Sequence, residues 1–360
     1  MFTMRSLIDE LVKLIEIPSP SGEEDKILRY IEKRLNELDI PFERQNVKKN
    51  YNLIVNPLDD PELIICTHVD TIPLLYHQTL RAEVEGERVY GLGSADAKGG
   101  ILSILLTLET IKEKENLRKF PVTFAFLVDE EGDGSGSEKL ADQYTSKYGI
   151  VLEPTGLDIC VAGAGSFEIE IEVIGKEAHG SAIEFGENAI MKAIDVIEKI
   201  NELSFLNEEH ELIGKSLYNI QRIEGGFDAL IVPKKCKMVL DFRILPNQDA
   251  KKIKKELHDY FDSKGIEYKL TDESMPFEIN MDAEIVSLLK KAYKDVLGKD
   301  AKIRGMKSWT DAQNLYERGI EPVVFGPGRL ETSHTSNEYV DVEDIILASK
   351  ILYRAISYLV

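Results

Sequence analysis

The chain has 360 residues, 43% of them hydrophobic and 30% charged, a balance typical of a globular protein with room for two domains. Its 44 Lys and Arg against 64 Asp and Glu give a net charge of −20, which argues against binding to nucleic acid or to a membrane surface. Three separated cysteines form no CxxC pair or disulfide framework, the N-terminus does not resemble a signal peptide, and no long apolar run occurs. These features predict a cytoplasmic protein.

The first half of the chain alternates helical and strand-like patterns. Apolar residues at helical spacing predict a helix over residues 7–15, and Ser21 with Glu24 forms a candidate capping box for a second helix ending near Leu35. Short apolar runs predict buried strands at 53–55, 63–66, 122–128 and 149–152, with a helix over 99–114 between the second and third. This alternation predicts an α/β fold around a parallel sheet.

The pattern changes near residue 163. Strands at 167–174, 216–222, 235–242 and 266–271, with helices at 186–203 and 250–264, give the order β-α-β-β-α-β, a ferredoxin-like α+β arrangement. A helix near 283–296, a strand near 321–325 and a helix over 343–359 then resume the earlier style. We therefore expect one α/β domain from residues 1–163 and 275–360, interrupted by an inserted domain over 164–274.

Acidic residues and histidines follow several of the predicted strands. His68 and Asp70 follow the strand at 63–66 and fall on one side of an extended segment, so the carboxylate can orient the imidazole for metal binding. Asp96 lies in the glycine-rich segment YGLGSADAKGG, and Glu130 and Glu131 lie in VDEEG after the strand at 122–128. Taken singly, each cluster is also compatible with a turn histidine or a solvated acidic loop.

Two further clusters complete the set. Glu153 ends the strand in GIVLEPTG, and His334 follows the loop FGPG. Two histidines and several carboxylates at the carboxyl ends of parallel strands suit Zn²⁺ or a similar ion, whereas oxygen ligands alone would suit Mg²⁺ or Ca²⁺. Five ligands exceed one tetrahedral site and fit two metals that share a carboxylate. A metal-assisted hydrolase is therefore the first hypothesis from the residues alone.

The motifs together resemble those of the M20 metallopeptidase family, which includes acetylornithine deacetylase, succinyl-diaminopimelate desuccinylase, aminoacylases and peptidases. The resemblance covers nearly the whole chain, through THVDT, GxGxxDxKGG, DEE, LEPT, GxxAHGS, DFRxxP, FGPG and HTSNEYV in family order. It implies a zinc-peptidase-like α/β catalytic domain and an inserted domain that acts as a lid and forms a homodimer. It also implies two divalent ions, foremost Zn²⁺, with Co²⁺ or Mn²⁺ tolerated by the same ligands.

The resemblance assigns roles to the clustered residues. Asp96 would bridge both metals, with a cis peptide bond after it, and Glu130 would be the general base that activates water. His68, with its imidazole oriented by Asp70, would bind one metal together with Glu153. Glu131 and His334 would bind the other metal.

The resemblance also assigns residues that contact the substrate. His179 would stabilise the oxyanion, in its own or the partner's site. Arg243 would bind the substrate carboxylate, and Gly328 would also contact the substrate. Lys307 could select an acidic group on the substrate or lie at the surface. Leu230 stands where many members have Asn, which leaves the usual contacts to the substrate in question.

The substrate class is the main alternative that the sequence leaves open. The compact chain favours removal of an N-acyl group from an amino acid, with acetylornithine, acetyl-lysine, carrier-linked lysine and succinyl-diaminopimelate all candidates. A di- or tripeptidase or a carboxypeptidase is the alternative, because specificity depends on a few pocket contacts. A metal-binding relative without turnover is the non-enzymatic alternative.

Overall fold

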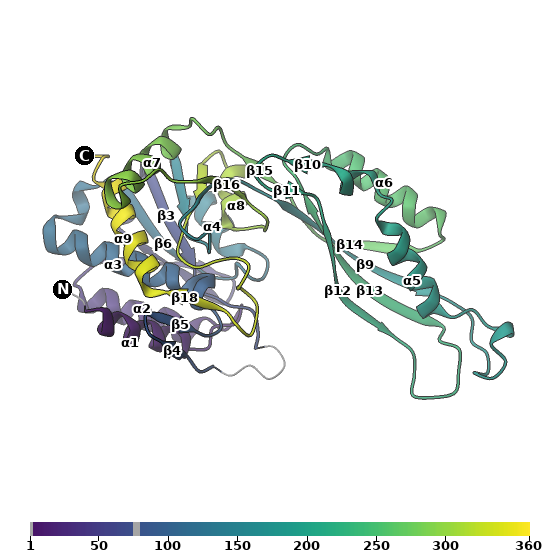
Figure 1. The fold of residues 1–360 in the computed structure, drawn as a ribbon. Coiled ribbons are helices and arrows are strands. Elements are labelled where there is room, and N and C mark those ends of the chain that lie inside the picture. The colour runs from purple at the N-terminus through teal and green to yellow at the C-terminus, as the bar shows by residue number, and fades with distance from the viewer. Residues whose placement is uncertain (1–2, 75–79) are drawn as a thin grey trace. The chain divides into compact units, whose positions relative to one another are not determined.

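The structure, a computed structural model, describes residues 3–74 and 80–360, which form two compact units (Figure 1). The first unit takes the chain up to Val161 and resumes over Ile279–Met306 and Thr310–Val360. The second unit comprises Ala162–Glu278 together with Lys307–Trp309. Among the described residues, no helix has both the length and the apolar character needed to cross a bilayer.

A large sheet forms the centre of the first unit. Its strands lie in the order β1 (Phe42–Val47), β2 (Asn50–Val55), β6 (Val122–Leu127), β3 (Leu63–His68), β7 (Tyr148–Val151), β17 (Glu321–Val324) and β8 (Ile159–Gly163). At the end of this order, β16 (Ile303–Met306) pairs with β8. The last residues of β8, which belong to the second unit, pair with β15 (Phe277–Glu278) of that same unit. Every residue of β3 and β6 is buried, so both faces of the sheet are covered there.

The sheet is parallel at its centre and antiparallel at its edges. Strands β6, β3, β7 and β17 run parallel, whereas β1–β2, β2–β6 and β17–β8 are antiparallel pairs. The expectation of a parallel sheet is therefore wrong for the strand at 53–55. That strand is the second arm of a tight hairpin turning at Lys48, whose φ is 46°. The first arm, β1, carries polar residues suited to a sheet edge, which hid it in the sequence.

Helices pack on the sheet in two groups. One group, α3, α7 and α9, packs together, and α4 packs against α8. Gly100 of α3 lies so close to β3 that a Cβ on it would come within 2.6 Å of the Thr67 Oγ1 atom. The helices of this unit are α1 (Met4–Ile15), α2 (Asp25–Glu37), α3 (Gly99–Lys114), α4 (Ser135–Gln143), α7 (Glu284–Leu297), α8 (Asp311–Glu317) and α9 (Val342–Ile356).

The capping box predicted for the second helix is not formed. Helix α2 starts one residue after Glu24, and no side chain caps it. The Ser21 hydroxyl instead donates a hydrogen bond to the Asp70 Oδ2 atom at 2.7 Å. A tertiary partner that the local pattern does not contain therefore takes Ser21 away from the helix end.

A small antiparallel sheet, absent from the sequence-based prediction, joins two distant segments. Its strands lie in the order β18 (Tyr339–Asp341), β5 (Arg88–Tyr90) and β4 (Glu83–Glu85). Each strand spans three residues, too short for a clear hydrophobic pattern. The pairing places the segment after His334 beside the glycine-rich turn that contains Asp96.

The second unit has the predicted β-α-β-β-α-β order, which confirms the α+β arrangement of the insert. Helices α5 and α6 and the sheet enclose a core that includes Phe167, Leu240 and Phe261. A short hairpin, β10 (Glu209–His210) and β11 (Gly214–Lys215), precedes the second strand. In chain order the main elements are β9 (Gly165–Ile174), α5 (Ala189–Ile200), β12 (Tyr218–Gly225), β13 (Lys235–Ile244), α6 (Ala250–Ser263) and β14 (Glu267–Ser274), with sheet order β12-β13-β9-β14.

Candidate metal centre and active site

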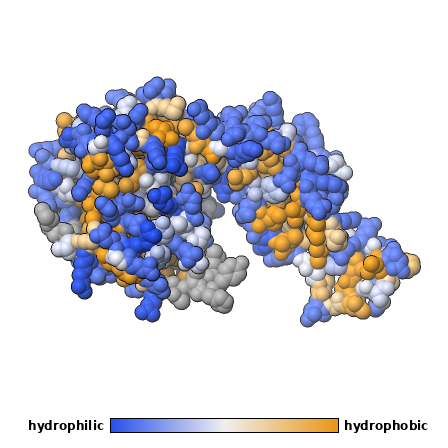
Figure 2. Space-filling model, viewed as in Figure 1, coloured by the Kyte–Doolittle hydropathy of each residue, from blue (hydrophilic) through white to orange (hydrophobic). Residues whose placement is uncertain are grey.

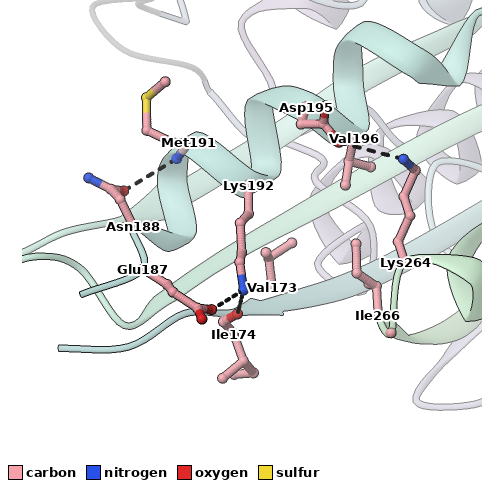
Figure 3. Close-up of a pocket in the computed structure, with 11 residues that line it drawn as sticks. Val173, Ile174, Glu187, Asn188, Met191, Lys192, Asp195, Val196, Lys264 and Ile266 are labelled. Carbon is pink, nitrogen blue, oxygen red and sulfur yellow. Dashed lines mark hydrogen bonds and ion pairs between the residues drawn. The ribbon is translucent and has the colours of Figure 1, made fainter. Parts of the chain in front are cut away.

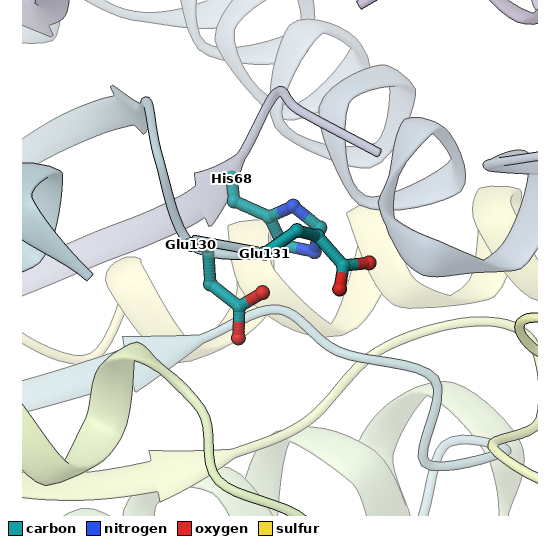
Figure 4. A group of neighbouring side chains, drawn as sticks. All are labelled: His68, Glu130 and Glu131. Atoms are coloured by element: carbon teal, nitrogen blue, oxygen red, sulfur yellow. The ribbon is translucent and has the colours of Figure 1, made fainter. Parts of the chain in front are cut away.

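The carboxyl ends of the four parallel strands carry the predicted site residues of the first unit. His68 ends β3, Glu130 and Glu131 follow β6, Glu153 follows β7, and the loop after β17 leads to His334. Because these strands are neighbours and parallel, their ends share one edge of the sheet, where ligands bind in α/β folds. Figure 4 shows His68 at the end of its strand beside Glu130 and Glu131.

Asp96 lies between the two histidines. Its Oδ1 atom is 3.1 Å from His68 Nε2, and its Oδ2 atom is 3.7 Å from His334 Nε2. The peptide bond between Asp96 and Ala97 is cis, as the family resemblance implies. One carboxylate thus presents a different oxygen to each imidazole, the arrangement required of a ligand shared by two cations.

The site residues form overlapping groups in which each residue offers one ligand atom, and these atoms lie within 4.8 Å of one another. His334 Nε2 is also 2.7 Å from Glu131 Oε1, so these two residues lie together with Asp96 in one group. Asp96 belongs to two of the groups, so the structure brings together both ligand sets expected from the sequence. The groups are His68 with Asp96 and Glu153, Asp96 with Glu131 and His334, and His68 with Glu130 and Glu131.

The contact that orients His68 differs from the sequence-based hypothesis. The Nδ1 atom of His68 lies 3.0 Å from the main-chain oxygen of Asp70 and 3.5 Å from its carboxylate. The Asp70 carboxylate accepts hydrogen bonds from the main-chain amides of Glu130, at 3.1 Å, and Glu131, at 2.9 Å. Asp70 therefore orients the imidazole mainly through its backbone, while its side chain holds the loop after β6.

Burial disfavours the charged form of every acidic group of the site, but only in some of them does it decide the pKa. Burial raises the pKa of Glu130 well above its usual range, and the charges of Glu153 and Glu131 add to this although His68 opposes it. Burial likewise raises the pKa of Glu153 well above its usual range. For Asp96, burial acts in the same direction but is outweighed by the hydrogen bond to His68 and by the charges of His68 and His334, so its pKa is lowered.

Both histidines favour protonation when no cation is present. Burial alone would lower the pKa of His68, but Glu130 and Glu153 outweigh it and raise the pKa well above its usual value. The same balance, with Glu131 as the main partner, raises the pKa of His334 to about 9. The cluster therefore holds protons that divalent cations would displace on binding.

The donor set fits a pair of divalent cations. Glu153 Oε1 is buried and has no hydrogen-bond partner in the part of the chain that the structure describes, and it lies 3.9 Å from His68 Nε2. A buried, unpaired carboxylate oxygen is costly unless a cation completes its surroundings. Imidazole nitrogens mixed with carboxylate oxygens suit Zn²⁺, Co²⁺ and Mn²⁺.

Two glycines allow the loop after β17 to reach the site. A Cβ on Gly326 would come within 2.5 Å of the Glu153 main-chain oxygen. Gly328 has a φ of 81°, and a Cβ on it would lie 2.7 Å from the Ala95 Cβ atom. The sequence assigned Gly328 to substrate binding, and the structure places it directly against the Asp96 turn.

His179 lies in the second unit, exposed on the loop between β9 and α5. Its Nδ1 atom accepts a hydrogen bond from the Ser181 main-chain amide at 3.2 Å and lies 2.7 Å from the Ser181 hydroxyl. Leu230 is a neighbour of this loop, because its main-chain oxygen accepts a hydrogen bond from the Gly180 amide. The residue that departs from the family pattern therefore lies beside the predicted oxyanion residue.

Two further residues predicted to contact the substrate, Arg243 and Lys307, also belong to the second unit. Arg243, near the end of β13, forms an ion pair with Asp241 at 2.6 Å and keeps part of its guanidinium exposed. Lys307 is exposed, and it groups with this unit together with Trp309.

Sequence reasoning missed two buried acids of the first unit. Glu338 accepts hydrogen bonds from the amides of Ala95 and Asp96, and burial raises its pKa to about 7. Burial also raises the pKa of Asp311, at the start of α8, to about 7. Glu338 occurs in the motif HTSNEYV and Asp311 in the segment KSWTDAQN, but no residue spacing marks either residue as a neighbour of the site.

A cavity of 590 Å³ in the second unit is a weaker candidate for a binding site. Figure 3 shows that its two lysines are already engaged, Lys192 with Glu187 and Lys264 with Asp195. The cavity therefore offers little unpaired positive charge for an anionic substrate. We place the candidate active site at the sheet edge of the first unit.

Comparison with known proteins defines first the fold and then the family. The structure matches that of a tripeptidase from Staphylococcus aureus with a TM-score of 0.80 at 22% identity, covering 100% of this chain and 99% of that one. In sequence, the chain is 28% identical over 364 residues to a LysW-lysine/LysW-ornithine hydrolase of Sulfurisphaera tokodaii, covering 99% of this chain and 96% of the relative. It is 27% identical over 357 residues to a succinyl-diaminopimelate desuccinylase of Corynebacterium glutamicum, covering 96% and 94%.

The family model described as peptidase family M20/M25/M40 matches residues 64–358. The chain belongs to this family, which confirms the resemblance drawn from its motifs. It is a hydrolase that acts on amide bonds, and the family's use of divalent metals agrees with the ligand groups at the sheet edge.

Proposed function

We propose that the chain releases an amino acid from an N-acyl or carrier-linked form by hydrolysis at a centre of two metal ions. The observation that carries this proposal is the shared carboxylate of Asp96, with one oxygen toward His68 and the other toward His334. Two bound cations would polarise the amide carbonyl and lower the pKa of the attacking water. Zn²⁺ is the foremost candidate, with Co²⁺ or Mn²⁺ suited to the same ligands.

Glu130 is the proposed general base. It lies beside His68 at the sheet edge, in one of the groups of closely spaced ligand atoms. Burial raises the pKa of its carboxyl group, which suits a residue that accepts a proton from water and then delivers it to the leaving amine. Glu131, held by His334, is the proposed ligand rather than the base.

His179 is the proposed oxyanion residue. Because Nδ1 accepts the Ser181 amide, a neutral ring carries its proton on Nε2, where it can donate to a developing oxyanion. Arg243 is the proposed partner of the substrate carboxylate, and its ion pair with Asp241 supports a fixed guanidinium orientation. The proposed contacts of Lys307 and of the Gly328 loop would add specificity for the acyl or side-chain group.

The relatives support the acyl-amino-acid class over the peptidase class. The two sequence relatives described above are named as a LysW-lysine/LysW-ornithine hydrolase and a succinyl-diaminopimelate desuccinylase. The tripeptidase likeness, at 22% identity, supports the fold, and a short-peptide substrate is therefore the second candidate. The three cysteines are buried and free, which supports a reducing, cytoplasmic setting.

We also propose that the second unit forms a homodimer. Figure 2 shows apolar side chains gathered on this unit. Ile183, Phe185, Phe227 and Leu230 are each about two-thirds exposed or more, which is unusual for large apolar side chains on one unit. The variant Phe227→Asp should shift the mass measured by light scattering from dimer to monomer. Val84→Asp, at an exposed apolar site of the first unit, should leave the mass unchanged.

A substrate panel tests the proposed reaction. Amine release would be followed by mass spectrometry for acetylornithine, acetyl-lysine, succinyl-diaminopimelate, simple N-acetyl amino acids and short peptides, with Zn²⁺ or Co²⁺ and a chelator control. Cleavage of an acyl substrate that the chelator abolishes would support the proposal. Cleavage confined to peptides would replace the substrate class, and cleavage that persists without metal would contradict the proposed centre.

A further inference from the structure

Glu338 is a buried carboxylate that contacts the turn carrying Asp96. It is 1% exposed and lies four residues after His334. Its Oε1 atom accepts hydrogen bonds from the main-chain amides of Ala95, at 3.0 Å, and Asp96, at 3.1 Å. Its main-chain oxygen accepts a third, from the Gly91 amide, also at 3.0 Å. Glu338 therefore accepts hydrogen bonds from the start of the glycine-rich turn, at Gly91, and from its later residues, Ala95 and Asp96.

These contacts connect the segments that supply two different ligands. Strand β18 begins at Tyr339, directly after Glu338, and pairs with β5 just before the turn. Glu338 therefore belongs to the segment of His334 but fixes the backbone of Asp96. A shift of Glu338 would alter the position of Asp96 relative to His334.

The chemistry of the contact suits a demanding positioning task. Burying a carboxylate costs free energy, which charge-assisted hydrogen bonds from amides partly offset. Such bonds are directional, and one of them restrains the amide of Asp96 itself. The backbone of Asp96 sets where its side chain starts, so this bond restrains where the two carboxylate oxygens can lie.

We propose that Glu338 is a positioning residue that holds the Asp96 turn so that the two carboxylate oxygens of Asp96 face two separate cations. This inference rests on the proposed metal centre and adds to it a residue outside the ligand set. The loss of such an outer partner typically weakens metal binding by about 10- to 100-fold.

Direct Co²⁺ binding tests this role without an assay of turnover. Metal-free protein would be titrated with Co²⁺ while the visible absorption is recorded, and far-ultraviolet circular dichroism would check that each variant is folded. We expect E338A to bind Co²⁺ at least about tenfold more weakly and with an altered spectrum. E338Q keeps an acceptor oxygen for the two amides and should restore most of the affinity.

A matched control distinguishes the positioning of Asp96 from a general weakening of the contact between the two segments. The Asp341 carboxylate pairs with Arg88 at 2.8 Å and connects the same two segments, and within the described part of the chain no hydrogen bond or ion pair joins it to the Asp96 turn. D341N should therefore lower thermal stability and leave Co²⁺ affinity and spectrum unchanged.

Several outcomes would overturn the role of Glu338. Normal Co²⁺ affinity and spectrum in folded E338A would do so, as would a loss in D341N or in E338Q equal to that in E338A. Failure of the wild-type protein to bind Co²⁺ would instead overturn the proposed metal centre, and this role with it.

Discussion

The carboxylate of Asp70 accepts the main-chain amide of Glu131 at 2.9 Å and so anchors the loop after β6 to the strand that carries His68. The same carboxylate accepts the amide of Glu130 and the hydroxyl of Ser21. The proposed base and a proposed ligand are therefore placed by a residue that was expected to act on the imidazole.

Replacing Asp70 by Ala should displace this loop. We expect about a 10- to 100-fold loss in kcat/KM, because the amides of Glu130 and Glu131 lose a shared partner. Ser21→Ala removes a single hydrogen bond and should have a much smaller effect. Equal losses in the two variants, measured by steady-state kinetics with metal content checked, would contradict the anchoring role.

Glu130 and its neighbour should fail in different ways. Glu130→Ala should lose at least about 10³-fold in kcat while retaining metal, because the proton acceptor is removed and the ligands remain. Glu131→Ala should lose metal as well as turnover, since its carboxylate pairs with His334. Metal content by elemental analysis beside kcat distinguishes the two, and near-normal turnover in metal-loaded Glu130→Ala would exclude Glu130 as the base.

A side chain at Gly326 should disturb the site through the backbone of Glu153. A Cβ there would come within 2.5 Å of the Glu153 main-chain oxygen, so Gly326→Ala must shift the backbone of a proposed ligand. Overpacking of this kind costs about 1–3 kcal/mol, and we expect weaker metal binding in addition. Gly319→Ala, at a positive φ but with nothing within 4 Å, reports backbone strain alone and should leave metal affinity unchanged.

The stability of the metal-free protein should fall as the pH rises. The pKa of His334 is raised from 6.5 to about 9, so its contribution is present in full below 6.5 and is lost as the pH passes through 9. The pKa values of Glu338 and Asp311 are raised from 4.5 and 3.8 to about 7. These groups also make the stability fall as the pH rises toward 7, because ionising a buried carboxyl group destabilises the folded state.

Thermal unfolding in a chelator measures this decline. Added Zn²⁺ should oppose it, because the ligands bind metal in their deprotonated forms. His334→Ala should flatten the decline between 6.5 and 9. An unchanged slope in His334→Ala would show that His334 is not the group responsible.

Much of the fold was predictable because its strands and helices carry strong local patterns. The helix expected over 99–114 is α3, and the buried runs at 63–66 and 122–128 are β3 and β6. The edges were less predictable, because β1 is polar and β4, β5 and β18 are only three residues long. Pattern alone does not give strand direction, so the hairpin of β1 and β2 was missed.

The sequence by itself determined the family, the enzyme class and the residue types of the candidate metal centre, because these depend on motifs that are local in the chain. The tertiary structure decided which contacts hold that centre in place. Asp70 binds the loop after β6 rather than mainly the imidazole, and Glu338 reaches a turn more than two hundred residues away in the chain. Such contacts depend on the packing of distant segments and on the burial of charge, and neither leaves a periodic trace in the sequence.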